Sequence, residues 1–194
     1  MTMMSAFLRL STVIDCDHPE VVNRATILAI GSDDQIEIAR RCFEWVRDEI
    51  QRSRDFGLRP VTCTASEVLH IGSGYCYAKS HLLAAILRAY RIPAGLCYQR
   101  LSRAENGALM SLNGLNAFLL PESGWYRIYQ RGNRAGIDAR FEPPVDQLAF
   151  PIAVVGEGNL PGIYVEPMPE IVNVLCTNTT ADDLWESQPD IEPD

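Results

Sequence analysis

The stretch GSGYCYAKSHLL, residues 72–83, decides how this chain folds. Its glycines break any preceding helix, because glycine is a poor helix former that favours turns. From about Cys76 to Tyr90 the residues leave little polar surface, and Pro93 follows them, which predicts a central and mostly buried helix. The stretch therefore places a thiol at the first turn of a buried helix, behind a flexible glycine loop.

Two further helices are predicted before this one. Apolar residues recur at three- and four-residue steps from Ile36 to Ile50, behind Ser32 or Asp33 as the helix N-cap. Thr64 and Glu67 stand at capping-box spacing, which predicts a short helical turn that ends at the glycines of residues 72–74.

The pattern changes after Pro93 to short runs typical of antiparallel strands. These runs are residues 96–101, 111–120 and 125–129, with turns predicted at Asn106-Gly107 and Ser123-Gly124. After residue 143 the spacing of proline and glycine argues against long regular elements, apart from a short helix at residues 181–186.

Composition limits the classes of function. The chain has 194 residues and a formal charge of −8, with no uncharged apolar run long enough to span a bilayer, so we expect neither nucleic acid nor a membrane as a partner. We also expect no signal peptide in residues 1–10. One domain over residues 1–180 and a solvated acidic tail over residues 181–194 are predicted.

The six cysteines predict no metal site and no disulfide framework. They include no C-x-x-C pair and no histidine at zinc-finger spacing, so we expect no cofactor and a reduced cytoplasmic compartment. Apart from Cys76, we interpret them as small hydrophobic residues of the core.

Cys76 is the candidate nucleophile. Free backbone N–H groups and the positive end of a helix dipole stabilise a thiolate there, and can lower the pKa of a cysteine from about 8.5 to between about 3.5 and 7.5. Gly74, two residues earlier, lets a substrate approach the backbone.

The segment from Ser66 to Leu101 closely resembles the bacterial transglutaminase-like family. Further matches in the same order are DHP at residues 17–19, VRDEI at 46–50, NGLNA at 113–117 and GWYRI at 124–128. The resemblance implies an α+β, papain-like fold, in which a cysteine-bearing helix packs on an antiparallel sheet. It also implies acyl transfer or amide hydrolysis through a cysteine thiolate, with a histidine and an aspartate on adjacent strands.

This chain departs from the family pattern at the partners of the cysteine. Asn113 stands where the family usually has histidine, Tyr129 where it usually has aspartate, and Arg52 where it often has histidine. An amide does not titrate near neutral pH, and a tyrosine with a reference pKa of about 10 is a poor general base.

Three histidines remain as substitutes. His81 lies five residues after Cys76 on the same helix and points away from it, so we interpret it as structural. His18 is remote in sequence. His70 is the best candidate, because the glycine loop lets it fold back toward the thiol, although an ordinary surface histidine is the alternative.

Several other residues are candidates for substrate binding. Tyr75, Tyr77, Tyr98 and Gln99 are expected to line the cleft, with ordinary packing as the alternative for the tyrosines. Arg131 follows the altered aspartate position and is a candidate for holding an anionic group, or it is part of a turn.

Three hypotheses of function follow. The first is a repurposed transglutaminase-like enzyme acting on a small amide, thioester or related acyl substrate around Cys76. The second is a pseudoenzyme that binds a peptide or metabolite in the old cleft. The third is an isomerase or cyclase that uses Tyr129 and Asn113 without the cysteine. The sequence leaves the substrate and the oligomeric state open.

Overall fold

The computed structural model describes residues 3–104, 109–133, 138–146 and 148–193. Its helices are α1 (Met3–Ala6), α2 (Pro19–Ala29), α3 (Gln35–Glu49), α4 (Ser53–Phe56), α5 (Ala65–Ile71), α6 (Cys76–Ala89), α7 (Pro169–Thr177) and α8 (Ala181–Glu186). Its strands are β1 (Gln51–Arg52), β2 (Ser73–Gly74), β3 (Ala94–Ser102), β4 (Met110–Leu120), β5 (Gly124–Ile128) and β6 (Gly158–Asn159).

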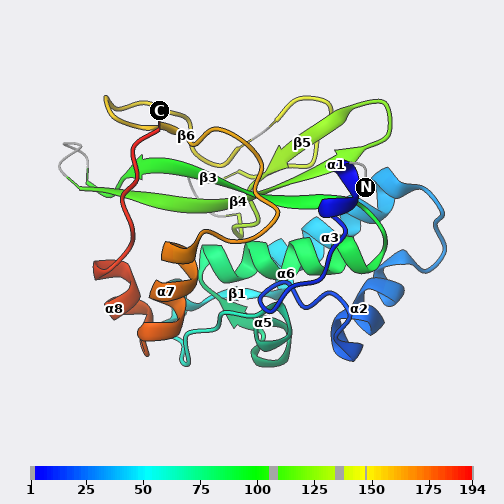
Figure 1. Ribbon diagram of the computed structural model, residues 1–194, viewed down its shortest axis with the longest axis horizontal. Coiled ribbons are helices and arrows are strands. Elements are labelled where there is room, and N and C mark those ends of the chain that lie inside the picture. Colours follow the sequence, from blue (N-terminus) through cyan, green and yellow to red (C-terminus); the bar gives the residue numbers. More distant parts are fainter. Residues whose placement is uncertain (1–2, 105–108, 134–137, 147, 194) are drawn as a thin grey trace.

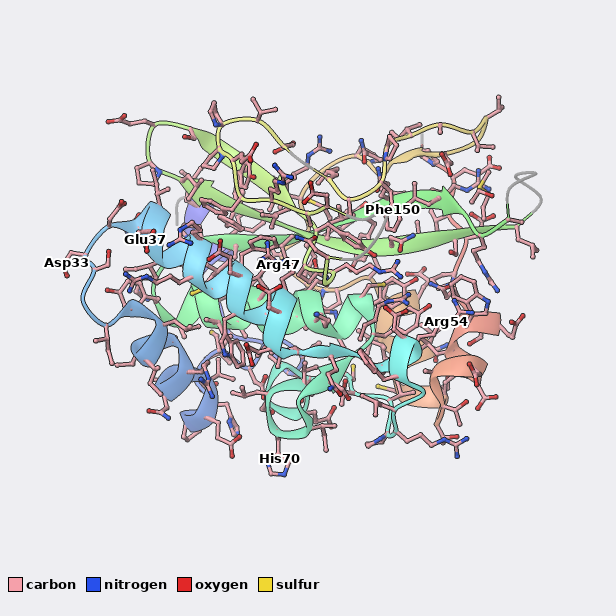
Figure 2. All side chains as sticks on the ribbon, turned by 180° about the vertical axis from the view of Figure 1, so that it is seen from behind. Asp33, Glu37, Arg47, Arg54, His70 and Phe150 are labelled. Atoms are coloured by element: carbon pink, nitrogen blue, oxygen red, sulfur yellow. The ribbon has the colours of Figure 1, made fainter. Side chains whose placement is uncertain are left out.

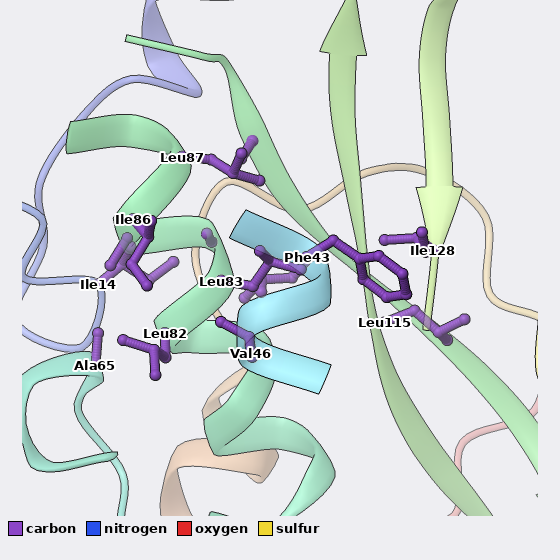
Figure 3. Packing of buried hydrophobic residues seen from close by; sticks show 14 of the residues in the cluster. Ile14, Phe43, Val46, Ala65, Leu82, Leu83, Ile86, Leu87, Leu115 and Ile128 are labelled. Atoms are coloured by element: carbon purple, nitrogen blue, oxygen red, sulfur yellow. The ribbon is translucent and has the colours of Figure 1, made fainter. Parts of the chain in front are cut away.

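The predicted central helix is α6. A four-stranded sheet covers one side of it, and α2 and α5 lie on the opposite side (Figure 1). Residues 76–88 are all buried, because apolar groups from the sheet and from three helices surround them. Figure 3 shows Leu83 and Leu87 of α6 packed near Phe43 of α3 and toward the sheet residue Leu115. Within the described part of the chain, no helix has the length and apolar character needed to cross a bilayer.

The three predicted strands are confirmed as antiparallel neighbours. The sheet has the order β5-β4-β3-β6, and its register pairs Gln99 with Asn113 and Asn116 with Ile128. The turn predicted at Asn106-Gly107 lies outside the described residues. The α+β fold implied by the resemblance, with the cysteine-bearing helix packed on an antiparallel sheet, is therefore confirmed.

A second, two-stranded parallel sheet brings the end of α3 to the loop before the cysteine. In this sheet β1 pairs with β2, and Arg52 lies opposite Gly74. The ammonium of Lys79 supports the same corner, since its Nζ donates to the carbonyls of Ile50 at 2.6 Å and Arg47 at 3.3 Å. These carbonyls lie where α3 ends and lack partners within the helix.

The helix starts were predicted in part. Thr64 and Glu67 form the predicted capping box of α5. The N-cap of α3 is Asp34, whose carboxylate accepts from the N–H of Ile36 at 3.0 Å, so the prediction of Ser32 or Asp33 was wrong by one or two residues. Ser32 instead accepts from the N–H of Asp34.

The C-terminal part differs most from expectation. Helix α7 was missed, because Pro169 was read as a helix breaker although proline fits the first position of a helix. The predicted helix at 181–186 is confirmed as α8. The acidic segment after it was expected to be solvated and loose, but it contacts the sheet: Leu112 N–H donates to Pro189 O at 2.9 Å, and Arg100 pairs with Asp190.

Candidate functional site

Cys76 lies at the first position of α6, as predicted, but its thiol is buried. The residue is 3% exposed, and its Sγ is hydrogen-bonded by the backbone of Gly114 on β4 and of Tyr77. Burial raises the pKa of the Cys76 thiol above its ordinary value, while the guanidinium groups of Arg52 and Arg131 and the two backbone N–H groups lower it by less. The sequence predicted a lowered pKa from the helix N-terminus alone, and burial outweighs that effect.

Asn113 and Tyr129 meet beside the thiol. The Tyr129 hydroxyl donates to Asn113 Oδ1 at 3.2 Å, and Tyr129 interacts electrostatically with Cys76. Burial is the main cause that raises the pKa of Tyr129 above its ordinary value, so the phenol keeps its proton near neutral pH. The structure therefore brings together the three residues that the resemblance places in the site, and neither partner of the thiol is a base.

Gln130 connects the site to the sheet and was not identified from the sequence. Its Nε2 donates to the carbonyls of Cys76 at 2.6 Å and of Gly114 at 3.2 Å. Gly114 allows this close approach of β4 to α6, because a Cβ at this residue would lie 3.0 Å from Tyr77 Cδ1 and 3.2 Å from Tyr77 Cα. The only sequence signal for Gln130 was its place directly after the altered aspartate position.

Two buried arginines lie next to the thiol. Arg52 donates to Asp55 at 2.7 Å, and its guanidinium lies 5.1 Å from the centre of the Tyr75 ring. Arg131 lies 3.6 Å from the same Asp55 carboxylate and hydrogen-bonds Tyr129. The guanidinium groups of Arg52 and Arg131 therefore create a positive potential at the Cys76 sulfur.

The other predicted cleft residues divide into two groups. Tyr75 and Tyr77 flank Cys76 with their rings 5.5 Å apart, and Gly74 precedes them in β2. Tyr98 and Gln99 have other partners: the Tyr98 hydroxyl accepts from Met168 N–H, and Gln99 Nε2 donates to Phe150 O at 3.4 Å. Tyr98 is thus engaged in packing, the alternative that the sequence left open.

The structure places all three histidines away from the thiol. His70 projects into solvent from α5, on the side away from the sheet (Figure 2), and its Nδ1 is 3.8 Å from Glu20. His18 lines the same outer pocket as His70. His81 is fully buried, with Nδ1 2.8 Å from Cys63 O. The folding back of His70 that the sequence suggested is therefore not seen.

A pocket of about 400 Å³ lies beside Asn113 and the two arginines. Arg52, Asn113 and Arg131 form its wall toward the cysteine, and Arg103, Phe150 and Trp185 are among the residues of the other walls. Within the described part of the chain, no group of three or more histidine, cysteine, aspartate or glutamate side chains is suited to hold a metal ion. The site thus offers arginine, amide and aromatic groups to a ligand.

Comparisons with solved structures found chains to which this chain is similar. A presumed cysteine protease from Cytophaga hutchinsonii superposes with a TM-score of 0.51 at 15% identity, over 66% of this chain and 41% of that one. The periplasmic domain of TgpA from Pseudomonas aeruginosa gives 0.49 at 18% identity, over 64% and 45%. This chain therefore matches less than half the length of either structure, and no curated protein matches it.

The family is shown by the sequence comparison. The model of the transglutaminase-like superfamily matches residues 24–130, more than half of the chain, and this range contains Cys76, Asn113 and Tyr129. The likeness to the Cytophaga protein supports the same fold and does not bear on the chemistry of this chain. The chain belongs to the transglutaminase-like superfamily.

Proposed function

We propose that this protein is a binding member of its superfamily, which holds a peptide or a small metabolite in the ancestral cleft and does not transfer an acyl group. One observation carries the proposal: Asn113 and Tyr129, at the two altered positions, are hydrogen-bonded to each other, and Tyr129 interacts electrostatically with the buried Cys76. This choice favours the second of the three hypotheses drawn from the sequence.

Acyl transfer by Cys76 depends on the transfer of one proton. Attack on an amide requires the thiolate, so the thiol proton must move to a base and later reach the leaving amine. The Asn113 amide does not accept a proton near neutral pH. Tyr129 has a pKa raised by burial and keeps its own proton, and the three histidines lie elsewhere. Loss of a catalytic base commonly costs several powers of ten in rate.

A repurposed cysteine enzyme remains the second candidate, on a specific observation. The guanidinium groups of Arg52 and Arg131 and the N–H groups of Gly114 and Tyr77 all favour the charged form of the Cys76 sulfur. A substrate that supplies its own base would benefit from them. The isomerase or cyclase hypothesis has less support, because Tyr129 is 1% exposed and already hydrogen-bonded.

Thiol reactivity separates the first two candidates. Iodoacetamide labelling is measured against pH, with the modification at each cysteine quantified by peptide mass spectrometry. Exposed Cys176 and fully buried Cys42 serve as references for accessibility in the same molecule. We expect Cys76 to label far more slowly than Cys176, with a midpoint above about pH 8.5. A midpoint well below that value, or a stable acyl-enzyme with a thioester probe, would refute the binding function.

The cellular setting is also a proposal. All six cysteines are free, which fits a reduced cytoplasm. The net charge of −8 is unfavourable for nucleic acid and for anionic bilayers, so a peptide or small molecule is the partner that we propose.

A further inference from the structure

The pocket beside Asn113 carries buried arginine nitrogens without partners. Side-chain exposure is 7% for Arg52 and 10% for Arg103. In the described part of the chain, neither Arg52 Nε nor Arg103 Nε has a hydrogen-bond partner. Leaving a buried polar group unpaired costs about 1–3 kcal/mol, and more when the group is charged. Both Nε atoms are enclosed by protein, so a ligand in the pocket meets the terminal nitrogens of these guanidinium groups instead. Within the described residues, the terminal nitrogens of Arg103 make only a 3.7 Å ion pair with Glu186.

The carboxylates near the pocket are largely engaged. Asp55 lies between Arg52 and Arg131 and serves both. Both Glu157 oxygens accept backbone N–H groups, from residues 102, 153 and 154. Glu186 is 3.7 Å from Arg103 and 78% exposed, so solvent weakens that pair. Arg52 and Arg103 therefore retain capacity for another anion.

The remaining walls fit an organic body carrying that anion. Phe150 and Trp185 are among the residues of these walls. The guanidinium groups of Arg54 and Arg103 lie 3.2 and 4.2 Å from the centre of the Trp185 ring, and that of Arg131 lies 5.5 Å from the centre of the Phe150 ring, so part of each aromatic surface is already covered. Gln188 Nε2 donates to Tyr77 Oη at 3.1 Å, while its buried Oε1 has no partner among the described residues.

We infer that this pocket binds an organic anion, in which a carboxylate or phosphate group is held by Arg52 and Arg103 and an apolar or aromatic body lies against Phe150 and Trp185. Guanidinium groups bind both anions with paired N–H donors. The inference rests on the proposed function, because it names the class of molecule that the binding protein holds.

Calorimetric titration with matched probes tests the inference. The probes are N-acetyl-L-phenylalanine, its neutral amide N-acetyl-L-phenylalaninamide, and phenyl phosphate. We expect at least one anionic probe to bind at least about tenfold more tightly than the amide, as a charged hydrogen-bonded pair commonly gives. The stronger of the two anions identifies the head group. Equal affinity for the amide and both anions, or no anion binding below about 10 mM, would overturn the inference.

Variants locate the binding. Arg103→Gln is expected to weaken anion binding at least about tenfold, and Arg103→Lys to recover only part of it, since lysine keeps the charge and loses the fork of donors. Arg140→Gln is the matched control, because Arg140 is 56% exposed and pairs with Asp138 outside the pocket. Unchanged anion affinity in a folded Arg103→Gln protein would contradict the assignment. The probe titrations use the unaltered protein, so they test the inference even if the Arg103 variants fail to fold.

The two proposals fail separately. If Cys76 labels as an activated thiolate while the anion binds, the binding function is wrong and the pocket is a substrate subsite. If Cys76 is inert and no anion is preferred over the amide, only the anion inference fails. A titration of Cys76→Ala with the same probes measures the pocket without the thiol.

Discussion

Replacing Asn113 by histidine and Tyr129 by aspartate should make the Cys76 thiol more reactive. The two side chains already touch each other beside Cys76, so the new pair would lie where a base and its orienting acid are needed. The aspartate would be buried, but Arg131, which hydrogen-bonds Tyr129, and Arg52 supply compensating charge.

The size of the effect follows from the pKa of Cys76. In the natural chain burial raises this pKa above that of an ordinary cysteine, so the thiol is mostly protonated at pH 7. An adjacent imidazolium can lower the pKa to about 6. Relative to an ordinary cysteine with a pKa of about 8.5, a pKa of about 6 gives about 300-fold more thiolate at pH 5, and the lower basicity reduces the nucleophilicity of that thiolate about 15-fold. The net gain is at least about 20-fold at pH 5, because burial raises the pKa of the natural Cys76 thiol further.

The assay is iodoacetamide labelling of Cys76 against pH, read by peptide mass spectrometry. Asn113→Gln is the matched control, since it changes the side chain without adding a titrating group, and we expect its midpoint to stay above 9. Asn113→His alone should give a smaller gain, because Tyr129 cannot hold the imidazolium as an aspartate can. If the double variant melts cooperatively and keeps the midpoint of the natural chain, the placement of the two residues against the thiol is refuted.

Three further predictions concern the framework. Gly114→Ala should lower the free energy of unfolding by about 1–3 kcal/mol in denaturant titration, because the added methyl would press on Tyr77; full stability would show that β4 can move away. Burial lowers the pKa of Lys79 to about 7, so between about pH 7 and pH 10 the unfolded chain holds a proton on Lys79 that the folded chain has lost. The free energy of unfolding, compared with that of Lys79→Met, should therefore rise over this range by up to about 5 kcal/mol. The same dependence on pH in both proteins would contradict this prediction. Cys63 and Cys176 line the same surface pocket and interact electrostatically, so oxidised glutathione should join them in a disulfide, with two thiols oxidised and glutathione reduced. Non-reducing peptide mapping would detect the disulfide, and its absence, with Cys63→Ser as control, would refute their proximity.

Local patterns in the sequence were sufficient for the central elements. The apolar run after Cys76 predicted α6, since a helix without a polar face must be buried. The capping box at Thr64 and the period-2 runs after Pro93 likewise depend on neighbours within a few residues. Pro169 misled the prediction, because proline both ends helices and begins them, and only its position relative to the following residues distinguishes the two.

The candidate site was predicted in part. Cys76, Asn113 and Tyr129 were found through the resemblance, and the structure brings them together. Gln130 was missed, since its partners, the carbonyls of Cys76 and Gly114, lie 54 and 16 residues away. Arg52 was noted only as a departure from the family and not as part of a pocket.

The sequence by itself determined that a cysteine begins a buried helix and that its usual histidine and aspartate are replaced. Tertiary structure alone decided the burial of that cysteine, which raises its pKa, and the residues that line the neighbouring pocket. The reason is physical: a helix N-terminus favours a thiolate, but the larger opposing effect, loss of solvent, depends on Gly114, Tyr129 and other groups from distant segments that enclose the sulfur. The arginine pocket has the same origin, because Arg52, Arg103 and Arg131 are adjacent only after folding.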